Sequence, residues 1–237
     1  MPAQVERIDG WQSEAMAESR RTTPNAALSR RFEALLLDIG DVISAPVWEQ
    51  FDELEEHLGR RIAGRGPLEP DGDAAWQRFQ RGECSYYDYW REFATLNGYD
   101  DWRALFRDLA LHLPHRFVDP DAYALMDEAR TAGLKVGVLT NDGVGIAGHD
   151  FFASLPEFEE LDAFVDAREF GWAKPEPEPY LRAADTLGTA PERIVFLDDT
   201  QVCVEGAERV GMTGVLVDPI DKGPAFARTR QLLGLSP

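Results

Sequence analysis

The 237-residue chain has little cysteine and no long apolar run. Its only cysteines, Cys84 and Cys203, lie far apart, and its four histidines show no zinc-ligand spacing. This excludes a disulfide framework and a cysteine-rich metal site. No stretch approaches the ~18 consecutive apolar residues of a membrane-spanning helix. The polar first 30 residues lack the apolar segment of a secretory signal, so we expect a cytoplasmic protein.

Basic residues are also scarce. Lysine and arginine number 24 against 43 aspartates and glutamates, which gives a formal net charge of −19. Such a chain repels phosphate backbones and anionic lipid, so we expect neither a nucleic-acid partner nor a membrane surface. A small anionic substrate would need a local cation to overcome this field.

Short apolar runs are present and recur along the chain, at residues 34–37, 136–139, 163–165, 194–197 and 214–217. Each run is continuous and bounded by polar residues or glycine, as in fully buried parallel strands. Helical periodicity lies between the later runs, at 121–132, 178–187 and 204–210. This alternation predicts an α/β fold with a doubly wound parallel sheet.

One connection is too long for a simple crossover. Residues 38–135 separate the first two predicted strands, whereas a crossover needs only about a dozen residues or more. The segment is rich in aromatic residues at helical spacing, so we expect a small helical domain at 46–118 inserted into a core of 31–45 and 119–237. Most of its aromatic side chains should pack its own interior. We expect residues 1–30 to form a flexible tail with at most a weak helix at 11–21.

Polar side chains follow three of the predicted strands. Asp38 follows the first, Thr140 and Asn141 follow the second, and Asp198 and Asp199 follow the fourth. The carboxyl ends of parallel strands share one edge of a sheet, where ligands bind. Lys174 precedes the fourth strand in the segment AKPEPEPY. One edge of the sheet thus gathers carboxylates, a hydroxyl group and a cation.

These residue types suit phosphoryl chemistry. Carboxylates that lie close together repel one another unless a hard cation such as Mg²⁺ holds them. A metal ion and a lysine can neutralise a phosphoryl group. A carboxylate can then attack phosphorus and form an aspartyl-phosphate that water cleaves.

Four segments in order carry a resemblance to a known family. LLLDIGDVI, VGVLTND, AKPEPEPY and IVFLDDTQVCVEGAERVGM resemble the four motifs of the haloacid dehalogenase (HAD) superfamily. The insertion resembles the C1-type cap of its subfamily I phosphatase-like hydrolases, and RGECSYYDYWREF is similar to sequences of such caps. The resemblance implies a HAD-type Rossmannoid core and hydrolysis of a small phosphorylated metabolite, with sugar phosphates as one class.

The resemblance also implies a role for each matched residue. Asp38 would be the nucleophile, with Thr140, Asn141 and Lys174 binding the phosphoryl group and Lys174 bridging it to Asp38. The implied Mg²⁺ ligands are Asp38, Asp199, the backbone carbonyl of Gly40 and, directly or through a second layer of contacts, Asp198. The paired acids Asp198 and Asp199 argue against a true dehalogenase, which lacks the metal.

Two positions depart from the family pattern. Gly40 stands where most phosphatases of the superfamily carry an aspartate that acts as general acid/base, and Cys203 stands where Asp or Asn commonly supports the metal. Without a proton donor at position 40, leaving groups of low pKa should be favoured, such as those of anomeric sugar phosphates or acyl phosphates. Asp41 or an ordered water could replace the missing acid.

Other functions fit the same residues. The chain could be a catalytically weak module that binds a phosphorylated ligand or a protein partner, or it could be a phosphomutase; it could be a monomer or a homodimer. Residues 143–148 match the G-x-G-x-x-G dinucleotide pattern. Three polar residues separate this pattern from the strand, so we predict a flexible loop there rather than a nucleotide site.

Overall fold

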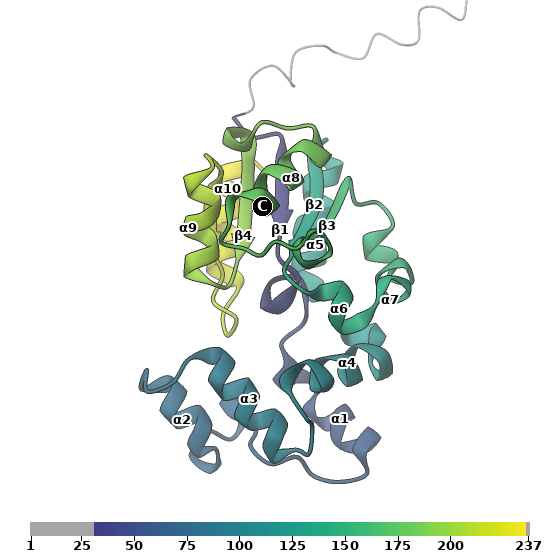
Figure 1. The fold of residues 1–237 in the computed structure, drawn as a ribbon, viewed down its shortest axis with the longest axis vertical. Helices are drawn as coiled ribbons and strands as arrows, with labels where there is room; N and C mark the ends of the chain where they lie inside the picture. Colours follow the sequence, from purple (N-terminus) through teal and green to yellow (C-terminus); the bar gives the residue numbers. More distant parts are fainter. Residues whose placement is uncertain (1–30, 236–237) are drawn as a thin grey trace, which may run out of the picture. The chain divides into compact units, whose positions relative to one another are not determined.

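The computed structural model describes residues 31–235, and we discuss the unit that begins at Phe32. The predicted tail at 1–30 and its weak helix lie outside the described residues. A five-stranded sheet with strand order β3-β2-β1-β4-β5 forms the core (Figure 1). Its strands are β1 (Ala34–Leu37), β2 (Lys135–Thr140), β3 (Ala163–Asp166), β4 (Ile194–Asp198) and β5 (Thr213–Leu216).

All neighbouring strands are parallel, which confirms the predicted α/β fold. The central strand β1 is the one whose bounds the sequence predicted without error, because its four residues are all buried between β2 and β4. Strands β2, β3 and β4 each extend to a polar last residue: Thr140, Asp166 and Asp198. The predicted polar residues therefore lie at one edge of the sheet.

Helices cover both faces of the sheet. Leu35 and Leu37 belong to a hydrophobic cluster with helices α5 (Pro120–Thr131) and α10 (Gly223–Leu233). Ala34 and Leu36 point the other way, as alternate strand residues do, and pack with α8 (Pro177–Leu187) and α9 (Gln201–Arg209). Helix α10 was not predicted, whereas α5, α8 and α9 lie where periodicity indicated.

The long connection after β1 forms helices with a hydrophobic cluster of their own. These are α1 (Phe51–Leu58), α2 (Ala74–Gln80), α3 (Tyr86–Leu96) and α4 (Trp102–His112). Aromatic rings fill this cluster; the Phe51 and Phe93 rings, for example, are stacked with centroids 5.1 Å apart. Helix α3 begins with a capping box, in which Ser85 and Asp88 each accept a hydrogen bond from the other's backbone N–H.

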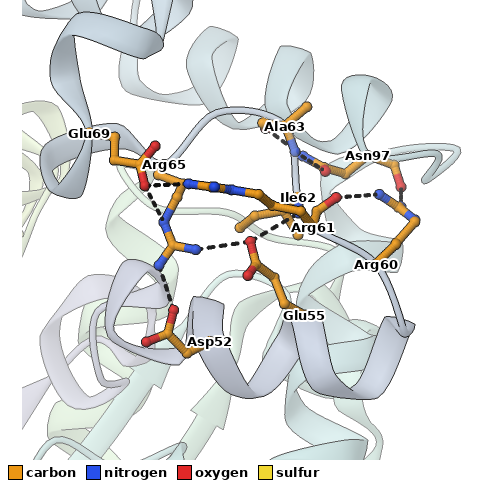
Figure 2. A network of polar contacts seen from close by, with 9 residues as sticks. All are labelled: Asp52, Glu55, Arg60, Arg61, Ile62, Ala63, Arg65, Glu69 and Asn97. Carbon is orange, nitrogen blue, oxygen red and sulfur yellow. Dashed lines mark hydrogen bonds and ion pairs between the residues drawn. The ribbon is translucent and has the colours of Figure 1, made fainter.

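A polar network fixes the segment that joins α1 to α2 (Figure 2). Arg65 donates to Glu55 at 2.9 Å and to Asp52 at 2.6 Å, both on α1. Asn97, just past α3, exchanges two hydrogen bonds with the backbone of Ala63, at 2.8 and 2.9 Å. These hydrogen bonds hold the glycine- and proline-rich segment in one conformation, although it contains no long helix.

The prediction of a flexible loop at 143–148 is wrong. Residues there form a short helix, α6 (Gly143–Ala147), followed by α7 (His149–Ala153). Asp166 at the end of β3 accepts a hydrogen bond from the Val144 backbone N–H at 2.8 Å, so a residue distant in sequence supports the start of α6. Within residues 31–235, no helix is long and apolar enough to cross a bilayer.

Gly206 on α9 allows this helix to approach the segment that follows Lys174. A Cβ atom there would lie 2.6 Å from Tyr180 Oη and 3.0 Å from the Pro175 carbonyl oxygen. We expect Gly206→Ala to lower the free energy of unfolding by about 1–3 kcal/mol, because overpacking outweighs the better helix propensity of alanine. Urea denaturation measures this. Gly72→Ala is the control, since a Cβ there meets nothing within 4 Å, and an equal loss in both variants would contradict the expectation.

Candidate active site

Asp38 lies directly past β1, and its backbone N–H donates to Leu197 O on β4 at 2.9 Å. This bond extends the β1–β4 ladder by one residue and therefore fixes the Asp38 backbone to the rigid core. Burial raises the pKa of Asp38 to about 6, although the charge of Lys174 acts in the opposite direction. The carboxylate therefore depends on nearby cations to stay ionised.

Lys174 is a buried cation between two carboxylates. Its Nζ lies 2.8 Å from Asp38 Oδ1 and 2.7 Å from Asp198 Oδ2, and it donates to Leu139 O at 3.0 Å. The residue is only 5% exposed. Burial alone would lower the pKa of Lys174, but the two carboxylates outweigh burial and raise it. The lysine is therefore a fixed positive charge beside Asp38.

Asn141 holds the backbone of Lys174. Its side-chain oxygen accepts from the Lys174 N–H at 2.7 Å, and its side-chain nitrogen donates to the Lys174 carbonyl at 3.3 Å. We predicted a phosphate contact for this residue, and the structure adds a positioning contact that the sequence did not indicate. The residue after β2 thereby ties the lysine segment to the sheet edge.

The two adjacent acids after β4 have different surroundings. Asp198 accepts from Lys174 through Oδ2 and from the Thr200 backbone N–H through Oδ1 at 2.9 Å, so both of its oxygens are engaged. Among the residues that the structure describes, Asp199 has only a long contact with the Thr200 hydroxyl, at 3.4 Å. Burial, followed by repulsion from Asp41, Asp38 and Asp198, raises the pKa of Asp199 to about 9.

This arrangement fits a hard divalent cation. Asp38, Asp198 and Asp199 each offer an oxygen atom, and the three atoms lie within 4.8 Å of one another. Lys174 is the only cation paired with these carboxylates among the described residues, so negative charge at the site is in excess. Carboxylate oxygens at this spacing are the ligands that Mg²⁺ prefers in proteins.

A cavity of about 150 Å³ opens onto these groups. Its wall on the core side includes Thr140, the buried last residue of β2, which lies in the same cavity lining as Asp38 and Lys174. The opposite wall consists largely of aromatic side chains from α3 and α4, among them Tyr86, Tyr87, Trp90, Trp102 and Phe106. Some of the predicted packing aromatics therefore also face the site.

The turn after Asp38 gives Gly40 and Asp41 different surroundings. Gly40 has ordinary extended dihedral angles, whereas Asp41 takes the left-handed conformation with φ 53°. Aspartate is one of the few non-glycine residues that tolerate this region. Ser44 Oγ accepts a hydrogen bond from the Asp41 N–H at 2.9 Å and supports the turn. The Asp41 side chain is buried in the cavity wall, and burial raises its pKa to about 6.

Cys203 also lines the cavity, at the start of α9. Its backbone carbonyl accepts a hydrogen bond from Tyr180 Oη at 2.8 Å. Burial raises the pKa of the Cys203 thiol to about 12, so it remains neutral and is a poor ligand for a hard cation.

Helix α4 contacts the segment that follows Asn141. Arg103 Nε lies 2.7 Å from Asp142 Oδ2. Arg107 donates to the carbonyl oxygens of Ile146, at 2.8 Å, and Gly145, at 3.2 Å. Through these contacts the inserted helices are joined to α6, next to the site.

The chain is similar in sequence and in fold to known hydrolases and phosphatases. The model of the haloacid dehalogenase-like hydrolases matches residues 32–211. The phosphatase MT3486 of Mycobacterium tuberculosis is 37% identical over 99 residues, which are 42% of this chain and 46% of that protein. The chain therefore aligns with less than half the length of this curated relative.

Two solved structures share the fold. The putative HAD hydrolase YfnB of Bacillus subtilis, bound to magnesium, has a TM-score of 0.58 and 16% identity, covering 87% of this chain and all of that one. A HAD phosphatase from Thermococcus onnurineus has a TM-score of 0.53 and 23% identity, covering 86% and 99%.

Removal of the buried lysine should leave two carboxylates unpaired. We expect Lys174→Met to lower the free energy of unfolding by about 3–5 kcal/mol in metal-free buffer. Lys135→Met is the control, because Lys135 is half-buried and bonds only backbone carbonyls, and we expect it to change less. Urea denaturation compares the two. Adding Asp198→Asn to Lys174→Met should recover part of the loss, and strictly additive losses would contradict the pairing.

Proposed function

The chain belongs to the haloacid dehalogenase-like hydrolase family, and we propose that it is a Mg²⁺-dependent phosphatase of a small phosphorylated metabolite. One observation carries the proposal: the Lys174 ammonium lies between Asp38 and Asp198 in a cavity that also contains Thr140. A buried carboxylate, a fixed cation and a hydroxyl group suit attack on phosphorus. In this proposal residues 46–118 act as a cap over a core of 31–45 and 119–237.

In the proposed reaction, Asp38 is the nucleophile. A bond forms between its carboxylate oxygen and phosphorus while the bond from phosphorus to the leaving oxygen breaks. Water then attacks phosphorus, the acyl phosphate bond breaks, and the Asp38 carboxylate and inorganic phosphate are released. Lys174 neutralises the phosphoryl oxygens and the Thr140 hydroxyl donates to them. Asn141 contributes by holding Lys174 in place.

Four groups would hold the metal ion. Asp38 and Asp199 supply carboxylate oxygens and Gly40 supplies its backbone carbonyl. Because both oxygens of Asp198 already accept hydrogen bonds, its share in the site is secondary. When bound, Mg²⁺ supplies positive charge that offsets the negative charge of the carboxylates. The likeness in fold to a magnesium-bound hydrolase agrees with this choice of metal.

The leaving group must depart without a proton donor at position 40. A leaving group of low pKa needs little help from an acid, which favours aryl, acyl or anomeric sugar phosphates over primary alkyl phosphates. Solvent then supplies the proton after the bond has broken.

We expect p-nitrophenyl phosphate to be hydrolysed in the presence of Mg²⁺ and kcat to fall on the order of 10³-fold or more in Asp38→Asn. Asp218→Asn is the matched control, since Asp218 follows β5 but does not line the cavity. Equal trace rates in the wild type and Asp38→Asn would refute the enzyme and favour a module that only binds a phosphorylated ligand.

Thermal stability gives a test of Mg²⁺ binding that does not depend on turnover. At 100 times its dissociation constant, Mg²⁺ should stabilise the wild type by about 2.7 kcal/mol. For a domain of this size that raises Tm by about 5–10 °C. The rise should be much smaller in Asp199→Asn, because this variant loses the carboxylate with the fewest protein partners. Thermal unfolding with Mg²⁺ and with EDTA measures both, and an equal rise in the two proteins would remove Asp199 from the metal site.

Gly40 has room for the side chain that the family usually carries there. Its dihedral angles suit any residue, and a Cβ would meet only Asp38 Oδ2 at 3.8 Å. We expect Gly40→Asp to raise kcat on primary alkyl phosphates by about 10²-fold, through a new proton donor, with little change on p-nitrophenyl phosphate. Gly40→Asn has the same shape without the acid and should show no gain; a gain in both variants would contradict the role of the proton.

A further inference from the structure

Two histidines from separate helices lie together where α1 and α4 end. The rings of His57, in the last turn of α1, and His112, the last residue of α4, have centroids 3.8 Å apart. Asp108 lies one helical turn before His112, on the same face of α4. Its Oδ1 lies 2.9 Å from His112 Nδ1 and 3.6 Å from His57 Nε2. Two segments far apart in sequence therefore bring two imidazoles and a carboxylate to one point.

Hydrogen bonding alone does not account for this arrangement. Both imidazoles face the same oxygen of Asp108, because the other oxygen, Oδ2, accepts from the Tyr99 hydroxyl at 2.6 Å. His112 Nδ1 also lies 3.0 Å from the Asp108 backbone carbonyl oxygen. At 3.6 Å, however, His57 Nε2 lies beyond hydrogen-bond distance of Oδ1. A cation can contact both ring nitrogens and the oxygen at once, which a shared proton cannot.

The distances between the three donor atoms suit a tetrahedral metal ion. One ligand atom from each residue lies within 4.8 Å of those of the other two. Zinc takes imidazole nitrogen and carboxylate oxygen at roughly 2.0–2.2 Å, which places neighbouring ligand atoms of a tetrahedron about 3.3–3.6 Å apart. The two distances to Asp108 Oδ1, 2.9 and 3.6 Å, fall close to that spacing. Small side-chain rotations therefore suffice to bring all three atoms to one ion.

The surroundings also favour a cation at this point. The Tyr99 hydroxyl fixes the Asp108 carboxylate with Oδ1 toward the two rings, and carboxylates that bind metals are commonly held by such hydrogen bonds. The side chains of His57, Asp108 and His112 are 33%, 22% and 47% exposed, so an ion can enter from solvent. Helix α1, with the sequence FDELEEHL, carries four acids in a chain that is already acidic.

The ligand types distinguish this cluster from the candidate active site. Imidazole nitrogen suits zinc and related transition metals, whereas Mg²⁺ prefers oxygen ligands alone. Among the described residues, two groups have the geometry of a metal site: this cluster and the active-site aspartates, which include no histidine. His57, Asp108 and His112 do not line the cavity that contains Asp38 and Asp199.

We propose that His57, Asp108 and His112 bind a divalent transition-metal ion such as Zn²⁺, with solvent as the fourth ligand. In the complex His112 Nδ1 binds the ion and the ring proton lies on Nε2. The ion joins the last turns of α1 and α4. Since α4 also carries Trp102 and Phe106 of the cavity wall, the ion stabilises the helices that form this wall. This site does not depend on the proposed function.

Isothermal titration calorimetry with Zn²⁺ tests the site in the full chain, after treatment with EDTA and dialysis into buffer with excess Mg²⁺. We expect one Zn²⁺ ion to bind tightly per chain. Tyr99→Phe keeps the three ligands and should lower the affinity about 10-fold, because the carboxylate loses its support. His57→Gln and His112→Gln each remove a ligand and should lower the affinity by about 100-fold or more.

Two control variants establish where the ion binds. His115→Gln should leave the affinity unchanged, because His115 pairs with Glu53 and not with the cluster. Asp199→Asn should also keep the tight binding, since Asp199 belongs to the active-site carboxylates. The proposal is overturned if no Zn²⁺ binds tightly, if the affinity is equal in the wild type, His57→Gln and His112→Gln, or if it is lost in Asp199→Asn.

Thermal unfolding provides a second measurement and also shows whether the variants fold. Without added metal, the Tm of His112→Gln should be close to that of the wild type, because the side chain is partly exposed. With Zn²⁺ at 100 times its dissociation constant, Tm of the wild type should rise by about 5–10 °C. The rise should be much smaller in His112→Gln, and equal rises would overturn the proposal. Neither measurement uses turnover, so the failure of one proposal leaves the other standing.

Discussion

The buried ion pairs of Lys174 are the interaction on which the site depends. A single ammonium group is held within 2.8 Å of Asp38 and 2.7 Å of Asp198, at the carboxyl ends of β1 and β4. Charges at this depth are tolerated only when each is paired and hydrogen-bonded. Leu139 O and the two backbone contacts from Asn141 complete the surroundings of the lysine. Three neighbouring strands thus contribute to one charge centre.

Even with this lysine the site remains short of positive charge. Asp199 shows the imbalance most clearly, since burial and the neighbouring carboxylates raise its pKa to about 9. An acidic chain with a net charge of −19 adds to the same field. The carboxylates are therefore short of positive charge, which a divalent cation would supply.

The sequence predicted the core well because its signals are local. A four-residue apolar run buried on both faces defines β1, and the residue after it is placed by the ladder hydrogen bond to Leu197. Helices α6 and α10 were not predicted, for different reasons. Helix α6 is glycine-rich and gains support from Asp166. Helix α10 buries Thr229 among its apolar residues, which weakens its periodic signal. That Asp41 and Tyr86 line one cavity could not be predicted, because residues so far apart in sequence come together only in the tertiary fold.

Contacts between α4 and the 142–146 segment have a consequence for how the cavity empties. Arg103 and Arg107 bind Asp142, Gly145 and Ile146, immediately after the residue that holds Lys174. Separation of α4 from α6 breaks those contacts, which adjoin the residue that positions Lys174. In the proposed phosphatase, a bound phosphoryl group that steadies the 142–146 segment also favours contact between α4 and α6, by thermodynamic reciprocity. Release of phosphate and separation of α4 from α6 are then linked in the proposed reaction.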